Sequence, residues 1–428
     1  MPPLAPVEVI ERRRRGEPLD AESITAFMRA WLDGVADDAQ MAAWCMAAGL
    51  EPARLEEVDA LARALVASGD RLDLSSFGPT GDVQSTGAVG ETASFAAIPI
   101  AAALGVTISS IGAASVGFSG GLIDRVVAIR GFDTEPELPA FVRALRAAGC
   151  ALMAPGRRLV TAAPRLDELR DATATGSGVA PTMATLMARA LAGGAGCIVL
   201  AVPVGRGAAL ADAGEGDAAI ALARSLAEPW GRSVRAVVLD ADTVPGLAVG
   251  AALEVGEVGA VLRGEGPSRV RDGALALAGA LAEGAGVAGA EEALAAAEAA
   301  LDDGRALRAA ERWVEAQGGD PSVWTDPALL GTARHRVPVC APRAGVVDDI
   351  DPRGLGEAAR WTGAGRLHAS QIIDPTAGVE ILVPVGTPVE ADQPVLMIHT
   401  SDAWLAERAH ALAVPRISVG PGGEGAGA

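Results

Sequence analysis

From about residue 78 onward, glycine-rich turns alternate with short apolar runs, and alanine-rich segments of helical character separate these runs. This alternation limits the folds open to the chain, because strands that alternate with helices favour βαβ units. It predicts an α/β domain with a mixed or parallel sheet. The expected strands are VTISSIG (106–112), GCALMAP (149–155), GCIVLAV (196–202) and VRAVVLD (234–240).

The segments before and after this alternation have different patterns of apolar and polar residues. Before it, Asp20 is a plausible N-cap for ESITAFMRAWLDG, and apolar residues follow at helical spacing. After about residue 335, short β-type runs dominate, and the glycine-rich end predicts a disordered tail. The expected units are an all-α lobe over 1–70 joined by about 160–192, an α/β lobe over 78–155 and 193–334, a C-terminal α+β subdomain over 335–415, and a disordered tail over 416–428.

Composition narrows the classes of function. The chain has 428 residues, 35 Lys plus Arg against 54 Asp plus Glu, and a net charge of −19, so a nucleic-acid-binding surface is not expected. Lysine is absent altogether, as are Asn and Tyr, which indicates GC-rich coding rather than chemistry. Four widely spaced cysteines, no apolar leader and no long apolar run predict a cytoplasmic protein with reduced thiols and no membrane segment.

Two glycine-rich segments are candidates for an anion or sugar site, namely GDVQSTGAVGET (81–92) and SIGAASVGFSGGLIDR (110–125). A glycine-rich turn that leads into a helix exposes backbone N–H groups at the positive end of the helix dipole, which suits phosphate. The alternative is a plain strand-to-helix turn that needs glycine for its backbone conformation. The hydroxyls that could assist belong to Ser85, Thr86, Thr92 and Ser94.

A third segment, LRDATATGSGVAPTMATLMARALAGG (169–194), places polar residues in an apolar helical context. Thr185 and Arg189 are four residues apart and therefore share a helix face, and Arg170 precedes them. Read alone, Arg189 is equally a solvated charge and Thr185 a hydroxyl at the edge of the core.

Together and in this order, the three segments resemble the thymidine/pyrimidine-nucleoside phosphorylase family, whose fold is related to that of anthranilate phosphoribosyltransferase. LRDATAT is close to a family signature, and AQGGDPSVWTDPALL (316–330), APRAGVV (341–347) and VGTPVEADQPV (385–395) resemble its C-terminal domain. The resemblance implies a small all-α lobe facing a large α/β lobe with a mixed sheet and a β-rich C-terminal subdomain. It also implies a nucleoside bound between the lobes, closure of the lobes on the substrate, and a homodimer formed through the α lobe.

The resemblance assigns the base-binding residues first. Arg170 stands where the family has its pyrimidine-binding arginine, Thr185 where it has a serine, and Arg189 where it has a lysine. The implied catalytic set is Arg170, Arg189 and Gln84, with Thr185 completing the pyrimidine site.

At the phosphate site the chain departs from the family. The family's Lys-His-Ser-Thr-Gly-Gly reads Val83-Gln84-Ser85-Thr86-Gly87-Ala88 here, so a lysine and a histidine are gone. In the second loop, Gly112, Phe118 and Leu122 replace a serine, a histidine and a threonine. The expected phosphate-binding residues are Ser85, Thr86, Thr92, Ser94 and Arg206.

Arg206 is included as a hypothetical replacement for the lost cation, helped by Arg125. The competing interpretation makes both of them ordinary surface arginines.

The implied function is reversible phosphorolysis of a pyrimidine nucleoside to free base and pentose 1-phosphate. Inorganic phosphate is the co-substrate, and no cofactor or metal is expected. The alternatives are a homologue that binds a pyrimidine nucleoside without phosphorolysis, or one that transfers the sugar to another acceptor such as water. In the last case a carboxylate near the loops, Asp82, Glu91 or Asp124, would orient water or stabilise the sugar cation.

Overall fold

The computed structural model describes residues 4–50, 53–114, 120–156, 158–176, 178–368 and 371–421. At its centre lies a five-stranded sheet with the strand order β3-β2-β1-β4-β5. Every neighbouring pair in this sheet is parallel, so of the two expected arrangements, mixed or parallel, the sheet has the parallel one. The strands are β1 (Thr80–Ser85), β2 (Thr107–Ile111), β3 (Cys150–Met153), β4 (Cys197–Val204) and β5 (Ser233–Asp240).

The four apolar runs expected as strands form β2 to β5, and the central strand β1 was missed. Its sequence, TGDVQS, carries one apolar residue, Val83, and was interpreted as the start of a glycine-rich turn. Asp82 and Gln84 are nevertheless buried, because β1 lies between β2 and β4 with helices on both faces. The polar composition of β1 therefore did not indicate a strand, although this strand carries residues of the site described below.

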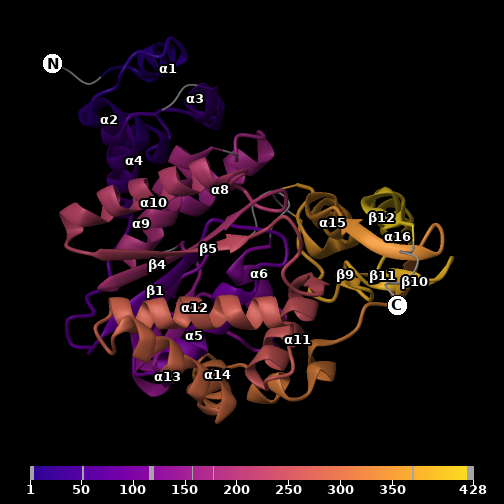
Figure 1. Cartoon of the computed structure of the whole chain (residues 1–428). Coiled ribbons are helices and arrows are strands. Elements are labelled where there is room, and N and C mark those ends of the chain that lie inside the picture. Colours follow the sequence, from indigo (N-terminus) through magenta and orange to yellow (C-terminus); the bar gives the residue numbers. More distant parts are fainter. Residues whose placement is uncertain are drawn as a thin grey trace.

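Helices cover the two faces of the sheet and create two apolar clusters. Ile198, Leu200 and Val202 of β4 belong to the cluster on one face, and Val199 and Ala201 belong to the other, as the two-residue period of a strand requires. Figure 1 shows α9 and α10 on one side of the sheet and α5 and α12 on the other. The helices of this lobe are α5 (Ala93–Ala103), α6 (Leu122–Val126), α7 (Leu138–Ala148), α10 (Ala213–Ala227), α11 (Ala251–Leu262), α12 (Ser268–Gly284), α13 (Ala290–Asp302) and α14 (Arg305–Ala316).

A helical lobe sits against the α9 face of the sheet (Figure 1). As expected, the side chain of Asp20 caps α2 by accepting the N–H of Ser23 at 2.7 Å. A tertiary contact joins two helices of the lobe: Arg13 of α1 forms a buried ion pair with Glu57 of α4 at 3.1 Å. The lobe comprises α1 (Pro6–Arg14), α2 (Ala21–Leu32), α3 (Asp38–Leu50), α4 (Leu55–Ala67), α8 (Ala162–Ala172) and α9 (Val179–Ala192).

The C-terminal region forms two small antiparallel sheets, with the strand orders β6-β9-β11-β7 and β10-β8-β12. β6 comes from the chain of the α/β lobe, so the two units share a sheet. The elements are β6 (Ala248–Val249), β7 (His335–Cys340), β8 (Gly345–Ile350), α15 (Pro352–Ala359), the π-helical turn η4 (Arg360–Ala364), β9 (Gly378–Ile381), β10 (Pro388–Val389), β11 (Pro394–Thr400), α16 (Ala403–Ala413), η5 (Val414–Arg416) and β12 (Ile417–Gly420).

The expectation of a disordered tail from 416 is wrong for its first residues. Ile417 and Val419 are buried at alternate positions of β12, which pairs with β8. The apolar alternation ISV was too short to stand out beside the glycine-rich end. Residues 422–428 lie outside the described part of the chain.

Candidate active site

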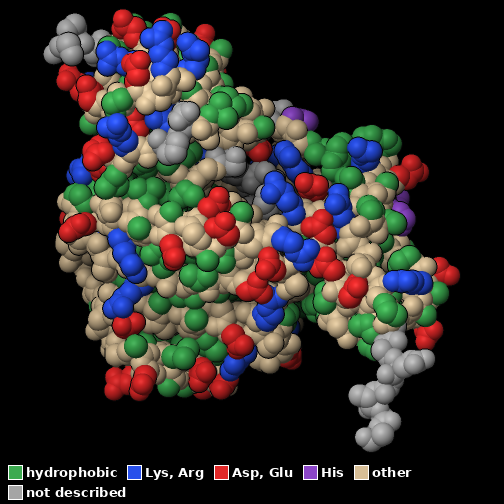
Figure 2. All heavy atoms as spheres, turned by 45° about the horizontal axis from the view of Figure 1, so that its top comes forward, with side chains coloured by type: hydrophobic (Ala, Val, Ile, Leu, Met, Phe, Trp, Pro, Cys, Tyr) green, Lys and Arg blue, Asp and Glu red, His purple; other side chains and the backbone are tan. Residues whose placement is uncertain are grey.

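The sheet topology predicts where a ligand binds. In an open parallel sheet, ligands lie beyond the carboxyl ends of the strands where the strand order reverses, because the connections there leave in opposite directions. Here the chain runs from β1 outward to β2 and β3, then returns to β4 and β5 on the other side of β1. The reversal lies between β1 and β4, and the loops after β1, β2 and β4 line a cleft of about 470 Å³ at this place. Figure 2 shows the molecule hollowed between the helical lobe and the α/β lobe, with arginine side chains gathered along one edge.

One end of the cleft, called the base pole after the ligand that the resemblance implies for it, is formed by Arg170, Thr185, Arg189 and Asp167 of α8 and α9. Asp167 holds the two guanidinium groups, at 2.9 Å from Arg189 and 3.6 Å from Arg170. One carboxylate thus faces two cations. This end of the cleft therefore keeps net positive charge, which suits an electron-rich or anionic group of a ligand.

Arg170 is buried and oriented by its own loop. Its Nε and Nη2 donate to the carbonyls of Thr175 at 3.2 Å and Gly176 at 2.9 Å. Burial lowers the pKa of the Arg170 guanidinium, and Asp167 opposes that shift. The side chain lines the cleft between the lobes, as the sequence predicted.

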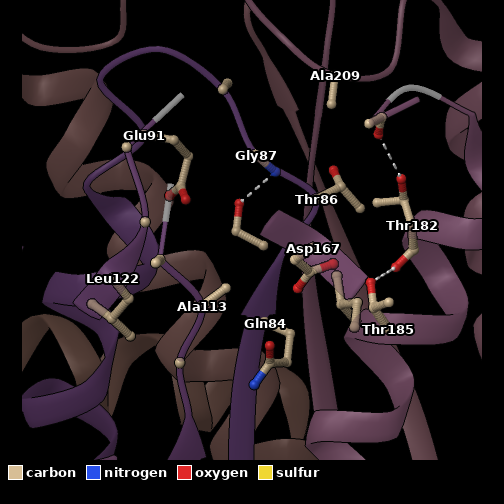
Figure 3. Close-up of a pocket in the computed structure, with 18 of the residues that line it drawn as sticks. Gln84, Thr86, Gly87, Glu91, Ala113, Leu122, Asp167, Thr182, Thr185 and Ala209 are labelled. Carbon is tan, nitrogen blue, oxygen red and sulfur yellow. Dashed lines mark hydrogen bonds between the residues drawn. The ribbon is translucent and has the colours of Figure 1, made fainter. Parts of the chain in front are cut away.

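Thr185 and Arg189 also face the cleft. The Thr185 hydroxyl donates back to the carbonyl of Thr182 at 3.1 Å, which leaves its oxygen lone pairs for an N–H of a ligand (Figure 3). The Nε of Arg189 is buried and has no hydrogen-bond partner within the described residues. An unpartnered buried guanidinium N–H beside a cleft is an unfilled donor.

The opposite end, the anion pole, is formed by Ser85, Thr86, Gly87, Glu91 and Ser94. The Ser85 oxygen accepts the N–H of Gly87 at 3.2 Å, and its own proton remains for a ligand (Figure 3). Thr86 is buried, and its hydroxyl has no partner among the described residues. Ser85 is the last residue of β1 and Thr86 follows it, so both side chains lie at the carboxyl end of the strand.

Glu91 changes the character of the anion pole. Its carboxylate accepts the backbone N–H of Ser94 and the hydroxyl of Ser94, both at 2.8 Å. These are the donors that the start of α5 would offer to a phosphate. A carboxylate of the chain itself therefore occupies part of the anion site, and Figure 3 shows Glu91 on the opposite side of the cleft from Thr182 and Thr185.

Two of the predicted phosphate ligands lie away from the cleft. Thr92 is fully buried, and its hydroxyl donates to the carboxylate of Glu257 at 3.0 Å. Burial raises the pKa of Glu257 to about 7. Arg206 pairs with Asp349 of the C-terminal region at 2.7 Å and donates to the carbonyl of Asp242 at 2.8 Å. The loop around Gly205 directs Arg206 toward the C-terminal sheets, so the structure gives no support to Arg206 as a replacement for the lost lysine.

Arg125 does reach the cleft, but its Nε forms a buried ion pair with Glu254. The second loop contributes Gly112 and Leu122, which line the cleft without polar side-chain atoms, while Phe118, with Ser115 and Ser119, lies outside the described residues. Of the carboxylates weighed from the sequence, Glu91 lines the cleft, and Asp124 pairs with Arg366 at 2.9 Å.

Asp82 lies fully buried two residues before Gln84 on β1. Burial raises the pKa of Asp82 to about 7, and hydrogen bonds from Gln84 and Ser110 oppose the shift.

Two groups of cleft residues were missed from the sequence. Asp167 was detectable, because it precedes Arg170 by three residues and so shares its helix face. Arg353, Glu357 and Arg360 of α15 and η4 also line the cleft, and Arg360 approaches Asp171 of α8 at 3.7 Å across it. No local signal connects these residues to a site formed some 180 residues earlier in the chain.

The described residues contain neither a cluster of metal ligands nor a helix suited to span a membrane. Among the residues that the structure describes, no cluster of three His, Cys, Asp or Glu side chains is suited to a metal ion. No helix in the described part of the chain is long and apolar enough to span a bilayer.

Comparison with known proteins agrees with this architecture. Residues 7–69 match the helical bundle domain of a glycosyl transferase family, residues 78–307 match its a/b domain, and residues 346–419 match the pyrimidine nucleoside phosphorylase C-terminal domain. A thymidine phosphorylase of Burkholderia cenocepacia is 36% identical over 416 residues, covering 95% of this chain and 94% of the relative. A pyrimidine-nucleoside phosphorylase of Geobacillus stearothermophilus is 33% identical, with 92% of each chain covered.

A solved structure shares the fold. The anthranilate phosphoribosyltransferase of Thermus thermophilus superposes with a TM-score of 0.57 at 22% identity, covering 72% of this chain and 99% of that one. The family models and the full-length relatives together settle the membership: the chain belongs to the thymidine and pyrimidine-nucleoside phosphorylase family.

Proposed function

We propose that this protein transfers the pentosyl group of a pyrimidine nucleoside to inorganic phosphate, releasing the free base and a pentose 1-phosphate. The observation that carries the proposal is that one cleft holds two cationic side chains of the helical lobe, Arg170 and Arg189, opposite the hydroxyls of Ser85 and Thr86 at the end of β1. A nucleoside between these poles presents its base to the helical lobe and the anomeric carbon to the acceptor.

In the proposed reaction, a phosphate oxygen forms a bond to C1′ while the bond from C1′ to the base nitrogen breaks. The bonding electron pair leaves with the base, which becomes an anion until it is protonated. The guanidinium groups of Arg170 and Arg189 stabilise that anion, and Thr185 accepts a ring N–H. Donors that are already in place when charge develops are the strongest source of such catalysis.

Lobe closure has a role in this scheme. The sugar carbon becomes strongly electrophilic as the base departs, so water must be kept out of the cleft. Asp171 of α8 and Arg360 of η4 approach each other at 3.7 Å across the cleft and support closure over the substrate. Phosphate is the co-substrate, and the proposed reaction needs no other cofactor.

A second function, transfer of the sugar to water, is favoured by one specific observation. Glu91 already accepts the Ser94 donors, and the chain has no lysine to offset the charge of a phosphate. A carboxylate next to the reacting carbon suits activation of water, as in glycoside hydrolysis. In this second scheme, Glu91 takes a proton from water as the oxygen bonds to C1′, while the bond from C1′ to the base nitrogen breaks and its electron pair leaves with the base.

One experiment separates the two functions. The purified protein is incubated with uridine, 2′-deoxyuridine and thymidine, with and without phosphate, and free base and pentose 1-phosphate are measured. Phosphate-dependent base release with stoichiometric pentose 1-phosphate supports phosphorolysis, and equal release without phosphate supports hydrolysis. Binding of a nucleoside without base release under either condition contradicts both catalytic schemes.

We also propose a homodimer formed through the helical lobe. Several apolar side chains of the helical lobe are exposed on α3, at the start of α4 and in the turn before α3, and exposed apolar groups on one lobe favour association. The exposed set comprises Val35, Met46, Leu50 and Leu55. Light scattering of the protein and of a Val35→Asp, Met46→Asp double variant tests this, since the variant is expected to be monomeric.

The four free thiols fit a reducing, cytoplasmic compartment.

A further inference from the structure

The side-chain amide of Gln84 is held in one orientation. Its Nε2 donates to Asp82 Oδ2 at 2.9 Å and to the carbonyl of Ile111 at 3.2 Å, which uses both amide hydrogens. The opposite orientation would place the amide oxygen against a carbonyl oxygen. Gln84 therefore presents its other end, the Oε1 oxygen, to any ligand as a hydrogen-bond acceptor.

The Oε1 atom is an open acceptor in the cleft. Gln84 lines the cleft, and no hydrogen bond to its Oε1 exists within the described ranges. Figure 3 shows the amide nitrogen turned away from Thr86 and the oxygen on the side nearer to it. An unpaired acceptor on a buried side chain that faces a cleft discriminates between ligands that bring a donor and ligands that do not.

The position of Gln84 shows which part of a nucleoside reaches it. Val83 points into the apolar cluster under α5, so its neighbour Gln84 points to the opposite face of the sheet, toward α9. The next residue, Ser85, belongs to the anion pole, while Thr185 and Arg189 form the base pole. Gln84 thus lies between the two poles, where the pentose must lie if the base and the acceptor occupy their ends.

We propose that Gln84 Oε1 accepts a hydrogen bond from the 2′-hydroxyl of the pentose, and that the protein therefore prefers ribonucleosides to 2′-deoxyribonucleosides. Of the sugar hydroxyls, the one on C2′ is nearest both to the base and to the reacting C1′. The base edge already meets Thr185 and the two arginines, so the free acceptor serves the sugar. The inference rests on the proposed nucleoside substrate and extends it to the sugar.

The test compares uridine, 2′-deoxyuridine and 2′-deoxy-2′-fluorouridine on the unmodified protein. The fluorine atom fills the 2′ position but donates no hydrogen bond. We expect uridine to bind roughly ten- to a hundredfold more tightly than both analogues by calorimetry, because binding affinity is independent of the effect of the 2′ substituent on cleavage of the bond to C1′. Equal values for uridine and 2′-deoxyuridine, or fluorouridine that matches uridine, overturn the inference.

A variant pair locates the effect at Gln84. Gln84→Met removes the acceptor at similar volume and should reduce the preference for uridine to about twofold or less. Ser109→Ala, on the neighbouring strand β2, is the control and should keep the preference, because Ser109 donates to the carbonyl of Gly193 and does not line the cleft. If the preference survives in Gln84→Met, the assignment to Gln84 is wrong. If Gln84→Met instead changes the preference between cytidine and uridine, Gln84 Oε1 binds an amine of the base and the inference is also wrong.

These outcomes separate the inference from the proposed function. Phosphate-dependent base release without sugar preference leaves the function intact and overturns the inference. Tighter binding of uridine without any base release supports the role of Gln84 and contradicts the catalytic function.

Discussion

The two ends of the cleft differ in how their charges are arranged. At the base pole, two arginines share one carboxylate, and Arg189 keeps a buried N–H without a partner among the described residues. At the anion pole, the carboxylate of Glu91 takes the donors of Ser94, and Arg125 is neutralised by Glu254. The base pole is thus prepared for an electron-rich ligand, whereas the anion pole already contains an anion. The two ends can differ in this way because they are built from different parts of the chain, the base pole from helices α8 and α9 and the anion pole from the end of β1 and the loop that follows it.

The largest effect is expected from Arg170→Ala at the base pole. Loss of this guanidinium removes charge-assisted hydrogen bonds worth roughly 1.5–3 kcal/mol each, so kcat/KM for phosphorolysis should fall roughly a hundred- to a thousandfold. Steady-state kinetics with uridine measure this.

Arg165→Ala is the matched control, because Arg165 lies on the same helix and pairs with Asp38 at the surface. Its activity should stay within roughly twofold of the unmodified protein. An Arg170→Ala variant that is as active as this control would break the comparison between the poles.

The second effect concerns Asp82, which lies beneath the base pole with a pKa raised by burial to about 7, against 3.8 in the unfolded chain. The folded protein therefore keeps the Asp82 proton to a higher pH than the unfolded chain does. The contribution of this proton to the free energy of unfolding is fully present below about pH 4 and is lost as the pH rises through 7. Urea unfolding of Asp82→Asn should show an advantage over the unmodified protein that grows by about 1.4 kcal/mol per pH unit in this window and then levels off.

Asn keeps an oxygen to accept the Gln84 amide, so the comparison tests ionisation and not packing. An advantage that is constant from pH 4 to pH 8 would show that the charge of Asp82 does not titrate in this range.

A third, smaller effect is expected at the anion pole from Glu91→Gln. The amide oxygen still accepts a hydrogen bond from Ser94, but the negative charge that repels phosphate is gone. We expect the KM for phosphate to fall by roughly tenfold. Glu91→Asp keeps the charge and is the control. If Glu91→Gln instead abolishes phosphate-independent base release, Glu91 activates water and the hydrolytic scheme is supported.

The smallest effect is expected from Arg206→Ala. Arg206 forms a half-exposed pair with Asp349, and such pairs contribute about 0–1 kcal/mol to stability. The KM for phosphate should remain within roughly twofold of its original value. A tenfold rise would mean that the anion pole extends to Arg206 and that its surface placement is not the functional one.

Most of the architecture could be predicted from the sequence. The period of the apolar residues predicted β2 to β5 and the helices around them, because those segments bury a face or a whole strand. β1 was not predicted, because its residues Asp82 and Gln84 are polar and are buried only by the strands and helices packed around them. The strand Ile417–Gly420 escaped for a similar reason, as it depends on pairing with β8.

The sequence by itself determined the chemical inventory of the site: Arg170, Thr185 and Arg189 at one end, Ser85 at the other, and no lysine anywhere. Only the tertiary structure decided which groups remain available to a ligand. It turned the carboxylate of Glu91 onto Ser94, directed Arg206 to Asp349, and fixed the amide of Gln84 with its oxygen toward the cleft. The physical reason is that a hydrogen-bonding group used within the protein is no longer available to a substrate, and such pairings form between residues far apart in the chain.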